Sequence, residues 1–550
     1  MTPGRVLQLN AKDNVLVALN DLRKGEQICF SGRTFTLTTD VPAKHKFATD
    51  DIPPGGAVVM YGVLIGKATE PIGSGEKLTT RNTHHEAAAF HQKTEYYRWA
   101  SPEVSHWRQK TFSGYVRDDG QVGTRNYWLV IPLVFCENRN IAALKQAFEE
   151  ELGFASPQVY RQLVAELVRS YQEGGSGQIE SSAVPGRGSE RQRPKIFENI
   201  DGIKFLIHEG GCGGTREDSN NLCALIAGYI HHPNVAGATV LSLGCQHAQT
   251  AILREEIKKR DRQFSKPLFV FEQQQSGSEF AMLSEAIRKT FLGLVGANKC
   301  TRKPVPLSHL CVGLKCGGSD GFSGISANPA IGHTSDLVVA LGGRTILSEF
   351  PELCGVEQEL INRTTQKEVG DRFIQLMRDY AARAKAVRSG FDMNPSPGNI
   401  RDGLITDAMK SAGAAKKGGT SPVTAVLDYP EYSTEPGLNL QCTPGNDVEC
   451  VTAQVGAGAN IVLFTTGLGT PTGNPIAPVV KISTNSQLTE NMPDIIDIDT
   501  GSVISGHRTI QQMGEQILDQ VIQFASGQAR TKAELLDQND FIPWKRGVSL

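Results

Sequence analysis

The sequence lacks the features that mark membrane, secreted and nucleic-acid-binding proteins. No apolar run approaches the roughly 20 residues that a membrane-spanning helix needs, and the N-terminus has no apolar segment like that of a signal peptide. The formal net charge of -2 leaves no general excess of basic residues for nucleic acid or a membrane surface. Eleven cysteines, spread through 550 residues, do not form the dense pattern of a secreted disulfide scaffold. We therefore expect a cytoplasmic protein that binds neither nucleic acid nor a membrane.

Several common cofactor motifs are also missing. The chain has no Walker loop, so the sequence does not support a kinase. It has no pair of cysteines spaced as in a zinc knuckle. The segment Gly467-Leu-Gly-Thr-Pro-Thr-Gly473 follows a strand-like run, but its glycine spacing is not that of a dinucleotide loop, and Pro471 opposes a helix directly after it. These observations exclude NAD binding at this loop.

What is present is the composition of a globular protein, with 39% hydrophobic and 21% charged residues in a chain long enough for two to four domains. Residues 1–90 contain short strand-like runs separated by turns, which predicts a small β-rich domain. Residues 91–113 are polar and are the expected linker. From residue 114 strand-like and helix-like runs alternate, which favours a parallel α/β sheet. A proline-containing turn suggests a division into 114–393 and 394–550, and the Gly, Ser and charged residues of 173–193 predict a mobile insertion.

Four cysteines repeat one placement. Each stands just past an apolar run that reads as a buried strand; they are Cys136, Cys212, Cys245 and Cys316. Ligands of doubly wound parallel sheets bind outside the carboxyl ends of the strands, so the four thiols could surround one crevice. A single cysteine at such a position is more often a small buried hydrophobe. The repetition nevertheless favours a metal site, and His208, in the loop of Cys212, adds an imidazole to the soft ligands that suit iron or zinc.

Other polar residues are candidates for handling an acidic substrate. His45 stands between two lysines, which makes an anionic substrate plausible, although a lone histidine is more often structural. Arg125 could hold a carboxylate with two hydrogen bonds, or equally form an ion pair. Ser319 and Asp320 follow Cys316 in a glycine-rich segment.

Ordered motifs along nearly the whole chain resemble the altronate and galactarate dehydratases. The segments that carry the resemblance are Lys44-His-Lys-Phe47, Gly120-Gln-Val-Gly-Thr-Arg-Asn126, His208 with Gly211-Cys212, Gly244-Cys245, Cys316-Gly-Gly-Ser-Asp320, Ala327-Asn-Pro329, Asn394-Pro-Ser-Pro-Gly-Asn399, Thr465-Thr-Gly-Leu-Gly-Thr-Pro471 and Val480-Lys-Ile482. Two further segments, Phe271-Glu-Gln-Gln-Gln275 and Pro351-Glu-Leu-Cys-Gly355, are more similar to the altronate branch.

The resemblance implies an N-terminal domain of the SAF type and an iron-dependent hydro-lyase of hexuronate catabolism. Its substrate would be D-altronate and its product 2-dehydro-3-deoxy-D-gluconate. In such a reaction a base removes the proton next to the carboxylate, and a general acid helps the neighbouring hydroxyl to leave. A bound Fe²⁺ would stabilise the negative charge that develops. A homo-oligomer is also expected.

The motif matches suggest roles for individual residues. For iron we expect His208, Cys212, Cys245 and Cys316, with Cys136 in addition. His45 and Asp320 are the candidates for acid–base catalysis. The residues expected to hold the substrate are Arg125, Asn126, Ser319 and Lys481.

Three alternatives remain open from the sequence. The substrate could be galactarate or another 2-hydroxy acid. The fold could serve a sugar-acid-binding protein without catalysis. The thiols could also hold an iron–sulfur cluster with a redox role, because both single iron ions and clusters use cysteine.

Overall fold

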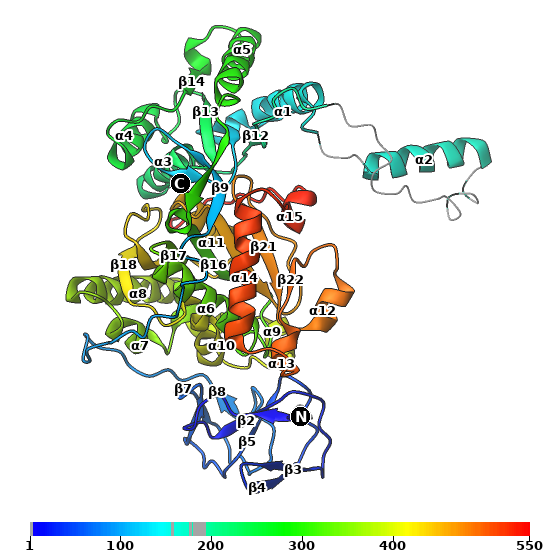
Figure 1. Ribbon diagram of the computed structural model, residues 1–550, viewed down its shortest axis with the longest axis vertical. Helices are drawn as coiled ribbons and strands as arrows, with labels where there is room; N and C mark the ends of the chain where they lie inside the picture. Colours follow the sequence, from blue (N-terminus) through cyan, green and yellow to red (C-terminus); the bar gives the residue numbers. More distant parts are fainter. Residues whose placement is uncertain (1–3, 156–158, 175, 177–178, 180–193, 550) are drawn as a thin grey trace.

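Three units follow one another along the chain in a computed structural model that describes residues 4–155, 159–174, 176, 179 and 194–549 (Figure 1). A strand-rich unit lies at one end, a seven-stranded α/β unit in the middle and a four-stranded α/β unit at the other end. The predicted fold class, a small β-rich domain before a large parallel-sheet α/β body, is confirmed. Most of the predicted insertion, 173–193, lies outside the described residues. Among the described residues no helix is both long and apolar enough to cross a membrane.

The N-terminal unit consists of three small antiparallel sheets. Their strands are β1 (Val6–Leu7), β2 (Val15–Ala18) and β5 (Lys46–Ala48); β3 (Gln27–Phe30) and β4 (Arg33–Thr36); and β6 (Ala57–Met60), β7 (Val63–Ala68) and β8 (Thr83–His84). Turns with positive-φ glycines, such as Gly25 and Gly55, separate short apolar runs. Each strand therefore buries only a few side chains, and every residue of β2 is buried.

The segment after β8 runs along the outside of the body before the second unit begins. It has no regular structure up to residue 110, and side-chain hydrogen bonds tie it to distant elements. Tyr97 donates to the carbonyl of Thr420 at 2.6 Å, and the indole of Trp107 donates to Asp519 at 2.9 Å. The expected linker is thus held against the body.

The second unit is a four-stranded parallel sheet in the order β12-β11-β13-β14. Its strands are β11 (Tyr127–Pro132), β12 (Gly202–Phe205), β13 (Val235–Ser242) and β14 (Leu268–Glu272), and its helices are α1 (Asn138–Leu152), α2 (Val159–Gly174), α3 (Arg216–His231), α4 (Thr250–Arg260) and α5 (Glu279–Ala297). A separate antiparallel sheet lies at the junction with the third unit, formed by β9 (Thr111–Val116), β10 (Val122–Gly123) and β15 (Arg302–Pro306).

The third unit is a seven-stranded parallel sheet in the order β18-β19-β17-β16-β20-β21-β22. Its strands are β16 (Cys311–Cys316), β17 (Arg344–Leu347), β18 (Val423–Leu427), β19 (Gly437–Gln441), β20 (Ile461–Thr466), β21 (Val479–Ser483) and β22 (Ile498–Asp499). Its helices are α6 (Ala327–Ala340), α7 (Glu357–Asn362), α8 (Lys367–Ala386), α9 (Pro397–Arg401), α10 (Asp407–Ala414), α11 (Asp447–Gly456), α12 (Ser486–Asn491), α13 (Gly501–Ile504), α14 (Ile510–Ala525) and α15 (Lys532–Leu535).

The division expected between residues 393 and 394 is not a domain boundary in this structure. β16 and β17 precede it, the other five strands follow it, and all seven belong to one hydrogen-bonded sheet. A proline-containing turn ends an element without ending a domain, and only the pairing of strands distant in sequence reveals the difference. Along the chain, the change from the four-stranded to the seven-stranded parallel sheet occurs instead between β14 and β16.

The two α/β units share a hydrophobic core. Leu225 and Ile226 of α3 belong to the same buried cluster as Val455 of α11 and Val462 of β20. A Cβ on Gly228 would lie 2.2 Å from the carbonyl oxygen of Gly456, so only glycine allows these helices to approach so closely.

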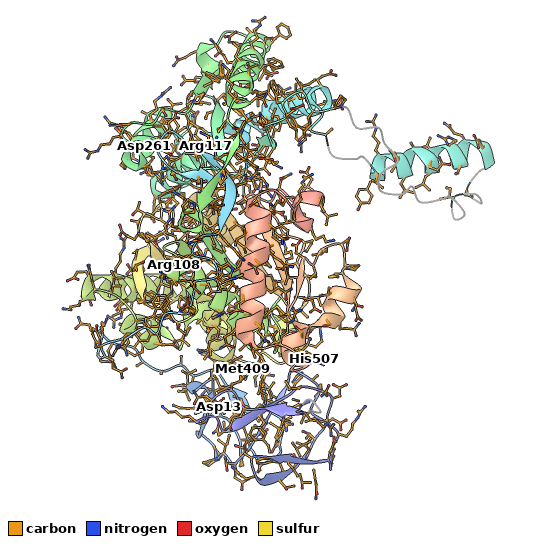
Figure 2. The ribbon with its side chains drawn as sticks, viewed as in Figure 1. Asp13, Arg108, Arg117, Asp261, Met409 and His507 are labelled. Atoms are coloured by element: carbon orange, nitrogen blue, oxygen red, sulfur yellow. The ribbon has the colours of Figure 1, made fainter. Side chains whose placement is uncertain are left out.

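The N-terminal unit also packs on the body through apolar side chains. Val15, Val58 and Ile65 share a buried cluster with Phe322 and Met409 of the third unit. Figure 2 shows Met409 where the body meets the N-terminal unit. The three units therefore form one continuous structure.

Candidate active site

A polar cavity of about 660 Å³ opens at the carboxyl ends of β16, β17 and β19. Loops that follow strands of a parallel sheet converge at this edge, which is where such sheets bind ligands. The residues that line it are Cys316, Gly317, Gly318, Ser319, Pro351, Glu352, Tyr380, Ala384, Ser389, Gly390, Phe391, Met393, Asn394, Ser396, Asn399, Lys410, Gly445, Asn446 and Asp447.

A buried thiol and two buried carboxylates meet at the wall of this cavity. Cys316 ends β16, and Glu349 and Glu352 follow β17. One ligand atom from each lies within 4.8 Å of the other two. Glu349 is a left-handed residue with φ of +67°, a strained conformation for a side chain with a Cβ, and its backbone N–H donates to Thr443 at 2.9 Å. Such strain persists where surrounding contacts hold it and is common at functional sites.

Three lysines neutralise these acidic groups. Lys417 places its Nζ 2.7 Å from a carboxylate oxygen of Glu349, and Lys315 also pairs with Glu349. Lys410 pairs with Glu352 at 2.8 Å. Because the group is buried, this mutual pairing is what allows the charges to remain there.

The lysines lower the pKa values of neighbouring acidic groups, whereas the glutamates raise them. Burial by itself would raise the pKa of Glu352, but Lys410, Lys315 and Lys417 hold it at about 2. Burial and the charge of Glu349 raise the pKa of the Cys316 thiol to about 12. Glu352 is therefore an anion and Cys316 a thiol at neutral pH.

Ser319 was predicted to hold the substrate, and its position suits that role. It lines the cavity, and its buried Oγ has no hydrogen-bond partner among the described residues. Asn399 donates to the Ser319 carbonyl at 2.7 Å, which fixes the loop. A buried hydroxyl without a hydrogen-bond partner costs stability unless a ligand forms a hydrogen bond with it.

The acid–base candidates His45 and Asp320 lie at the junction with the N-terminal unit, and neither lines the cavity. Lys44 pairs with Asp320 and with Asp402 at 3.0 Å each. His45 contacts the Arg401 carbonyl through Nε2 at 3.1 Å. These contacts dock one unit onto another, so the geometry does not support the catalytic roles expected for His45 and Asp320.

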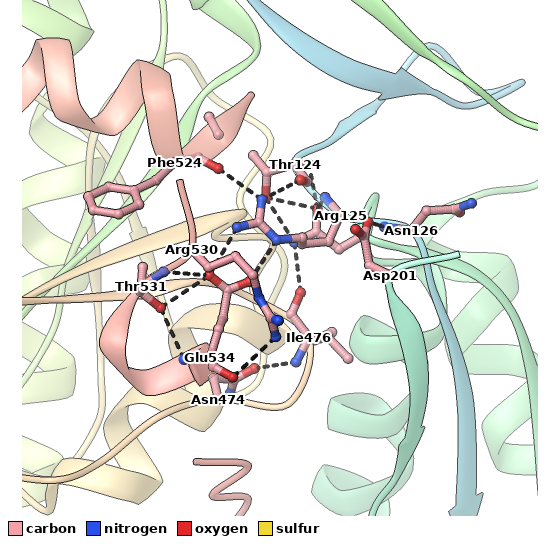
Figure 3. A network of polar contacts seen from close by, with 12 residues as sticks. Thr124, Arg125, Asn126, Asp201, Asn474, Ile476, Phe524, Arg530, Thr531 and Glu534 are labelled. Carbon is pink, nitrogen blue, oxygen red and sulfur yellow. Dashed lines mark hydrogen bonds and ion pairs between the residues drawn. The ribbon is translucent and has the colours of Figure 1, made fainter. Parts of the chain in front are cut away.

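Arg125 and Asn126 form hydrogen bonds with other parts of the protein, as Figure 3 shows for the arginine. Arg125 forms two hydrogen bonds with Glu534, at 2.7 and 3.0 Å, and donates to the Phe524 carbonyl at 2.8 Å. The Asn126 amide donates to Asn199 at 2.7 Å and accepts from an arginine at 3.0 Å. The alternative left open for Arg125, an ion pair, is the one that forms, and these contacts give no support to substrate binding by either residue.

Lys481 lies on β21 and is not among the residues that line the cavity. Its Nζ lies 4.7 Å from the centre of the Phe464 ring and has no hydrogen-bond partner among the described residues. Burial lowers its pKa to about 8. The structure does not place it in contact with a ligand in the cavity.

The other three predicted cysteines lie in loops at the end of the four-stranded sheet, whereas Cys316 lines the cavity of the seven-stranded sheet. The four cysteines therefore do not surround one crevice. The loops after β11, β12 and β13 carry Cys136, Cys212 and Cys245 and are joined by backbone bonds, from Phe135 to Gly210 at 3.1 Å and from Ala248 to Gly211 at 3.0 Å. These loops converge because the three strands are neighbours in one sheet. Cys316 belongs to the other sheet.

His208 lies in the same loop as Cys212, after β12, but both of its ring nitrogens are used. Nε2 contacts the Pro132 carbonyl at 2.8 Å, and Nδ1 accepts the Gly210 N–H at 3.1 Å. Burial lowers its pKa to about 4, so it is the neutral form that holds the two loops together. With no free nitrogen, the expected role of His208 as an iron ligand is not supported.

Sequence reasoning missed Glu349, Glu352, Lys410 and Lys417. One signal was present, because Lys315 interrupts an apolar strand, and a buried lysine needs a partner. Glu352 also stands in the segment Pro351-Glu-Leu-Cys-Gly355, which carried the resemblance without a role for its glutamate. Nothing in the sequence indicated that residues 349 and 417 meet.

Comparison with known proteins gives matches along the three units. Residues 4–86 match the altronate/galactarate dehydratase SAF domain, 114–298 the second domain of D-galactarate dehydratase/altronate hydrolase, and 307–549 the C-terminal domain of D-galactarate/altronate dehydratase. The chain is 32% identical to an altronate dehydratase of Bacillus subtilis and 33% identical to one of Escherichia coli, over 99% of each chain in both pairs. It is 28% identical to a galactarate dehydratase (L-threo-forming) of Escherichia coli, over 96% of this chain and 93% of the other.

Proposed function

The chain belongs to the altronate and galactarate dehydratase family and is a hydro-lyase that acts on a sugar acid, and we propose that its substrate is D-altronate and its product 2-dehydro-3-deoxy-D-gluconate. The observation that carries the proposal is the buried Cys316–Glu349–Glu352 group on a cavity large enough for a six-carbon acid. Two relatives that match over their full length, both altronate dehydratases, support it. The place of this reaction in hexuronate catabolism is part of the proposal.

The charge of the cavity favours altronate over galactarate. Lys410 is the only lysine, arginine or histidine among the described residues that line it. D-Altronate carries one carboxylate, whereas galactarate carries two, and a second carboxylate would meet Glu352 or Asp447 without a matching cation. Like charges brought together in a partly buried site are repelled.

The residues on the wall also fit a ferrous ion. Cys316, Glu349 and Glu352 would hold it, since a thiolate and carboxylates are ligands that iron accepts. When bound, Fe²⁺ would supply Lewis-acid stabilisation of the negative charge that develops on the substrate carboxylate. Lys315 and Lys417 already balance Glu349, so the positive charge of the ion would be balanced by the Cys316 thiolate and the substrate carboxylate.

The remaining wall residues can carry out the proton transfers. Asp447 also lines the cavity; it pairs with Lys315 at 3.0 Å, and its carboxylate can accept the proton from C2. Glu352 raises the pKa of Lys410 against the effect of burial and so holds it as the ammonium, which carries the proton that the C3 hydroxyl needs to leave as water. The Ser319 hydroxyl is free to bind a substrate hydroxyl. The enol that results tautomerises to the 2-keto-3-deoxy acid.

The test is anaerobic turnover of D-altronate and of galactarate, each with and without added Fe²⁺, with the 2-keto-3-deoxy product measured. We expect product from D-altronate that depends on iron, and at least about 100-fold lower kcat in Lys410→Met, which lacks the general acid. Glu352→Gln should lose both turnover and bound iron. Glu368→Gln, which changes an exposed glutamate in the first turn of α8, is the control that should keep both.

Two results would reject parts of the proposal separately. Preference for galactarate would contradict D-altronate as the substrate but would still agree with dehydration of a sugar acid. Full turnover by metal-free enzyme would contradict the dependence on iron but would still agree with D-altronate as the substrate.

The convergence of Cys136, Cys212 and Cys245 favours a second location for iron. A single ion does not fit these three as placed, because among the described residues they are not one of the groups whose ligand atoms lie within 4.8 Å. An iron–sulfur cluster holds its cysteines farther apart and is compatible with three converging loops. Acid-labile sulfide and visible absorption in anaerobically purified enzyme, lost in Cys212→Ser and kept in Cys316→Ser, would favour this location.

A further inference from the structure

A histidine, a cysteine and an aspartate from distant parts of the chain meet at the junction between the N-terminal unit and the body. His85 directly follows β8, Cys354 follows the short turn of helix Phe350–Leu353, and Asp407 is the first residue of α10. One ligand atom from each lies within 4.8 Å of the other two. None of the three lines the large cavity.

Asp407 is the unusual member of this group. Its side chain is completely buried, and neither carboxylate oxygen has a hydrogen-bond partner of normal geometry among the described residues; the neighbouring Cys354 thiol is the group that interacts with it. Burial raises the pKa of this carboxyl well above its ordinary value, and the negative charge of Glu352 raises it further. A buried carboxylate without hydrogen bonds is costly, so it normally carries a proton or binds a cation.

The two partners of Asp407 suit a cation. His85 and Cys354 are partly exposed, so the group can be reached from solvent. Burial lowers the pKa of His85, which leaves the imidazole neutral, the form that binds metals. Cys354 supplies a sulfur ligand whose Sγ lies within 4.8 Å of the ligand atoms of His85 and Asp407.

The same three residue types can also form a catalytic cysteine site, but the geometry argues against that use. In such a site the aspartate accepts a hydrogen bond from the histidine and orients it. Here Asp407 accepts none, and His85 Nδ1 faces the backbone N–H of Ala408 at 3.3 Å. That long contact can be replaced when the ring binds an ion.

We propose that His85, Cys354 and Asp407 bind Zn²⁺, or a divalent ion with the same preferences, at a site that joins the N-terminal unit to the catalytic body. One nitrogen, one sulfur and one oxygen ligand, with water as the fourth, match the tetrahedral coordination of zinc. The site is separate from the Cys316–Glu349–Glu352 group and does not depend on which sugar acid is the substrate. Because its ligands come from both units, a bound ion would hold the N-terminal unit in place.

The test uses full-length enzyme freed of metal with a chelator under anaerobic conditions. Zinc bound at equilibrium is measured by dialysis, and cobalt, as a spectroscopic substitute, is followed by its thiolate charge-transfer absorption. We expect His85→Ala and Cys354→Ser each to bind one equivalent less zinc than the wild type. His84→Ala, a change in the neighbouring exposed histidine, should bind as much as the wild type.

The cobalt spectrum separates this site from the other thiols. The component that disappears in Cys354→Ser should persist in Cys316→Ser, which removes a thiol from the proposed iron group only. Zinc should also raise the melting temperature of the wild type by more than that of Cys354→Ser. Equal zinc content in the wild type, His85→Ala and Cys354→Ser would overturn the proposal.

Asp407→Asn is a third variant, included because loss of zinc in the other two could also result from misfolding. The substitution keeps the shape of the side chain and removes a buried charge, so metal-free Asp407→Asn should melt at or above the temperature of the metal-free wild type. It should bind zinc less tightly. A stable Asp407→Asn variant with unchanged zinc affinity would also overturn the site.

Discussion

The Nζ of Lys417 lies 2.7 Å from the Sγ of Cys316, and both side chains are buried at the wall of the cavity. The same ammonium contacts Glu349 at 2.7 Å. Lys417 thus connects the thiol to the carboxylate, although 101 positions separate it from Cys316 along the chain. A fully buried lysine held in this way is part of both the stability and the charge balance of the site.

Lys417→Met should destabilise the protein and lower its turnover. Removing one partner of a buried ion pair leaves uncompensated charge, here on Glu349, and costs about 3 kcal/mol. Urea unfolding and steady-state kinetics measure the two effects. Lys416→Met, a change in the partly exposed neighbour, is the matched control. Equal stability of wild type and Lys417→Met would mean that Lys315 alone compensates Glu349.

Arg125→Lys should reduce stability without changing KM. Lysine cannot reproduce the two parallel bonds to Glu534 together with the bond to Phe524, and we expect a loss of about 3 kcal/mol. Thermal unfolding and the KM for the sugar acid distinguish this structural role from substrate binding. Arg530→Lys, an exposed change in the same network, should have little effect. A large rise in KM with normal stability would restore Arg125 as a substrate ligand.

Lys44→Met should loosen the N-terminal unit. Without the ammonium, the buried Asp320 loses its ion pair across the junction and keeps hydrogen bonds such as that from Thr484, with Lys46 as the remaining lysine nearby, so docking of the unit costs more. Limited proteolysis in the segment between β8 and β9 should become several-fold faster. Lys24→Met, on an exposed turn of the same unit, should be cut at the wild-type rate. Identical digestion of both variants would show that the apolar contacts suffice for docking.

The stability of the protein should depend on His208 below neutral pH. Its pKa is about 4 in the folded chain and about 6.5 when unfolded, so the unfolded state binds more protons between these values. This contribution is fully present above pH 6.5 and is lost as the pH falls towards 4, up to roughly 3 kcal/mol.

Unfolding free energies of the wild type and His208→Gln between pH 4 and 7 measure this contribution. The advantage of the wild type over the variant should shrink as the pH falls. His507→Gln, which changes an exposed histidine labelled in Figure 2, should track the wild type throughout. A constant difference between the wild type and His208→Gln would contradict the neutral, doubly bonded ring.

The strand and helix patterns read from local sequence agree with the structure, whereas the domain division expected at the proline-containing turn does not. Short apolar runs between turns indicated the strand-rich N-terminal unit, and alternating patterns indicated the parallel sheets. The apolar run before each of Cys136, Cys212, Cys245 and Cys316 does lead to a strand end, because alternation and burial are encoded in neighbouring residues. The resemblance to the dehydratase family, carried by ordered motifs, is confirmed by the comparisons.

Individual roles were harder to predict than elements. His45, Arg125 and His208 each have the chemistry of a functional residue, yet each satisfies its polar atoms with another part of the chain. The same side chain can bind a ligand or form a hydrogen bond with a carbonyl oxygen of the protein, depending on what the fold brings within hydrogen-bond distance. A motif records the residue type and not its partner.

The sequence by itself determined the class of the fold, the family and the presence of strand-end cysteines, because these follow from periodicity and from motifs read along the chain. Only the tertiary structure decided that Cys316 belongs to a different sheet from Cys136 and Cys212. It also decided that Cys316 meets Glu349 and Lys417, and that His85 faces Asp407. Strand order and the docking of units bring such residues together. Those contacts are set by burial of apolar surface over long sequence separations, which no local pattern encodes.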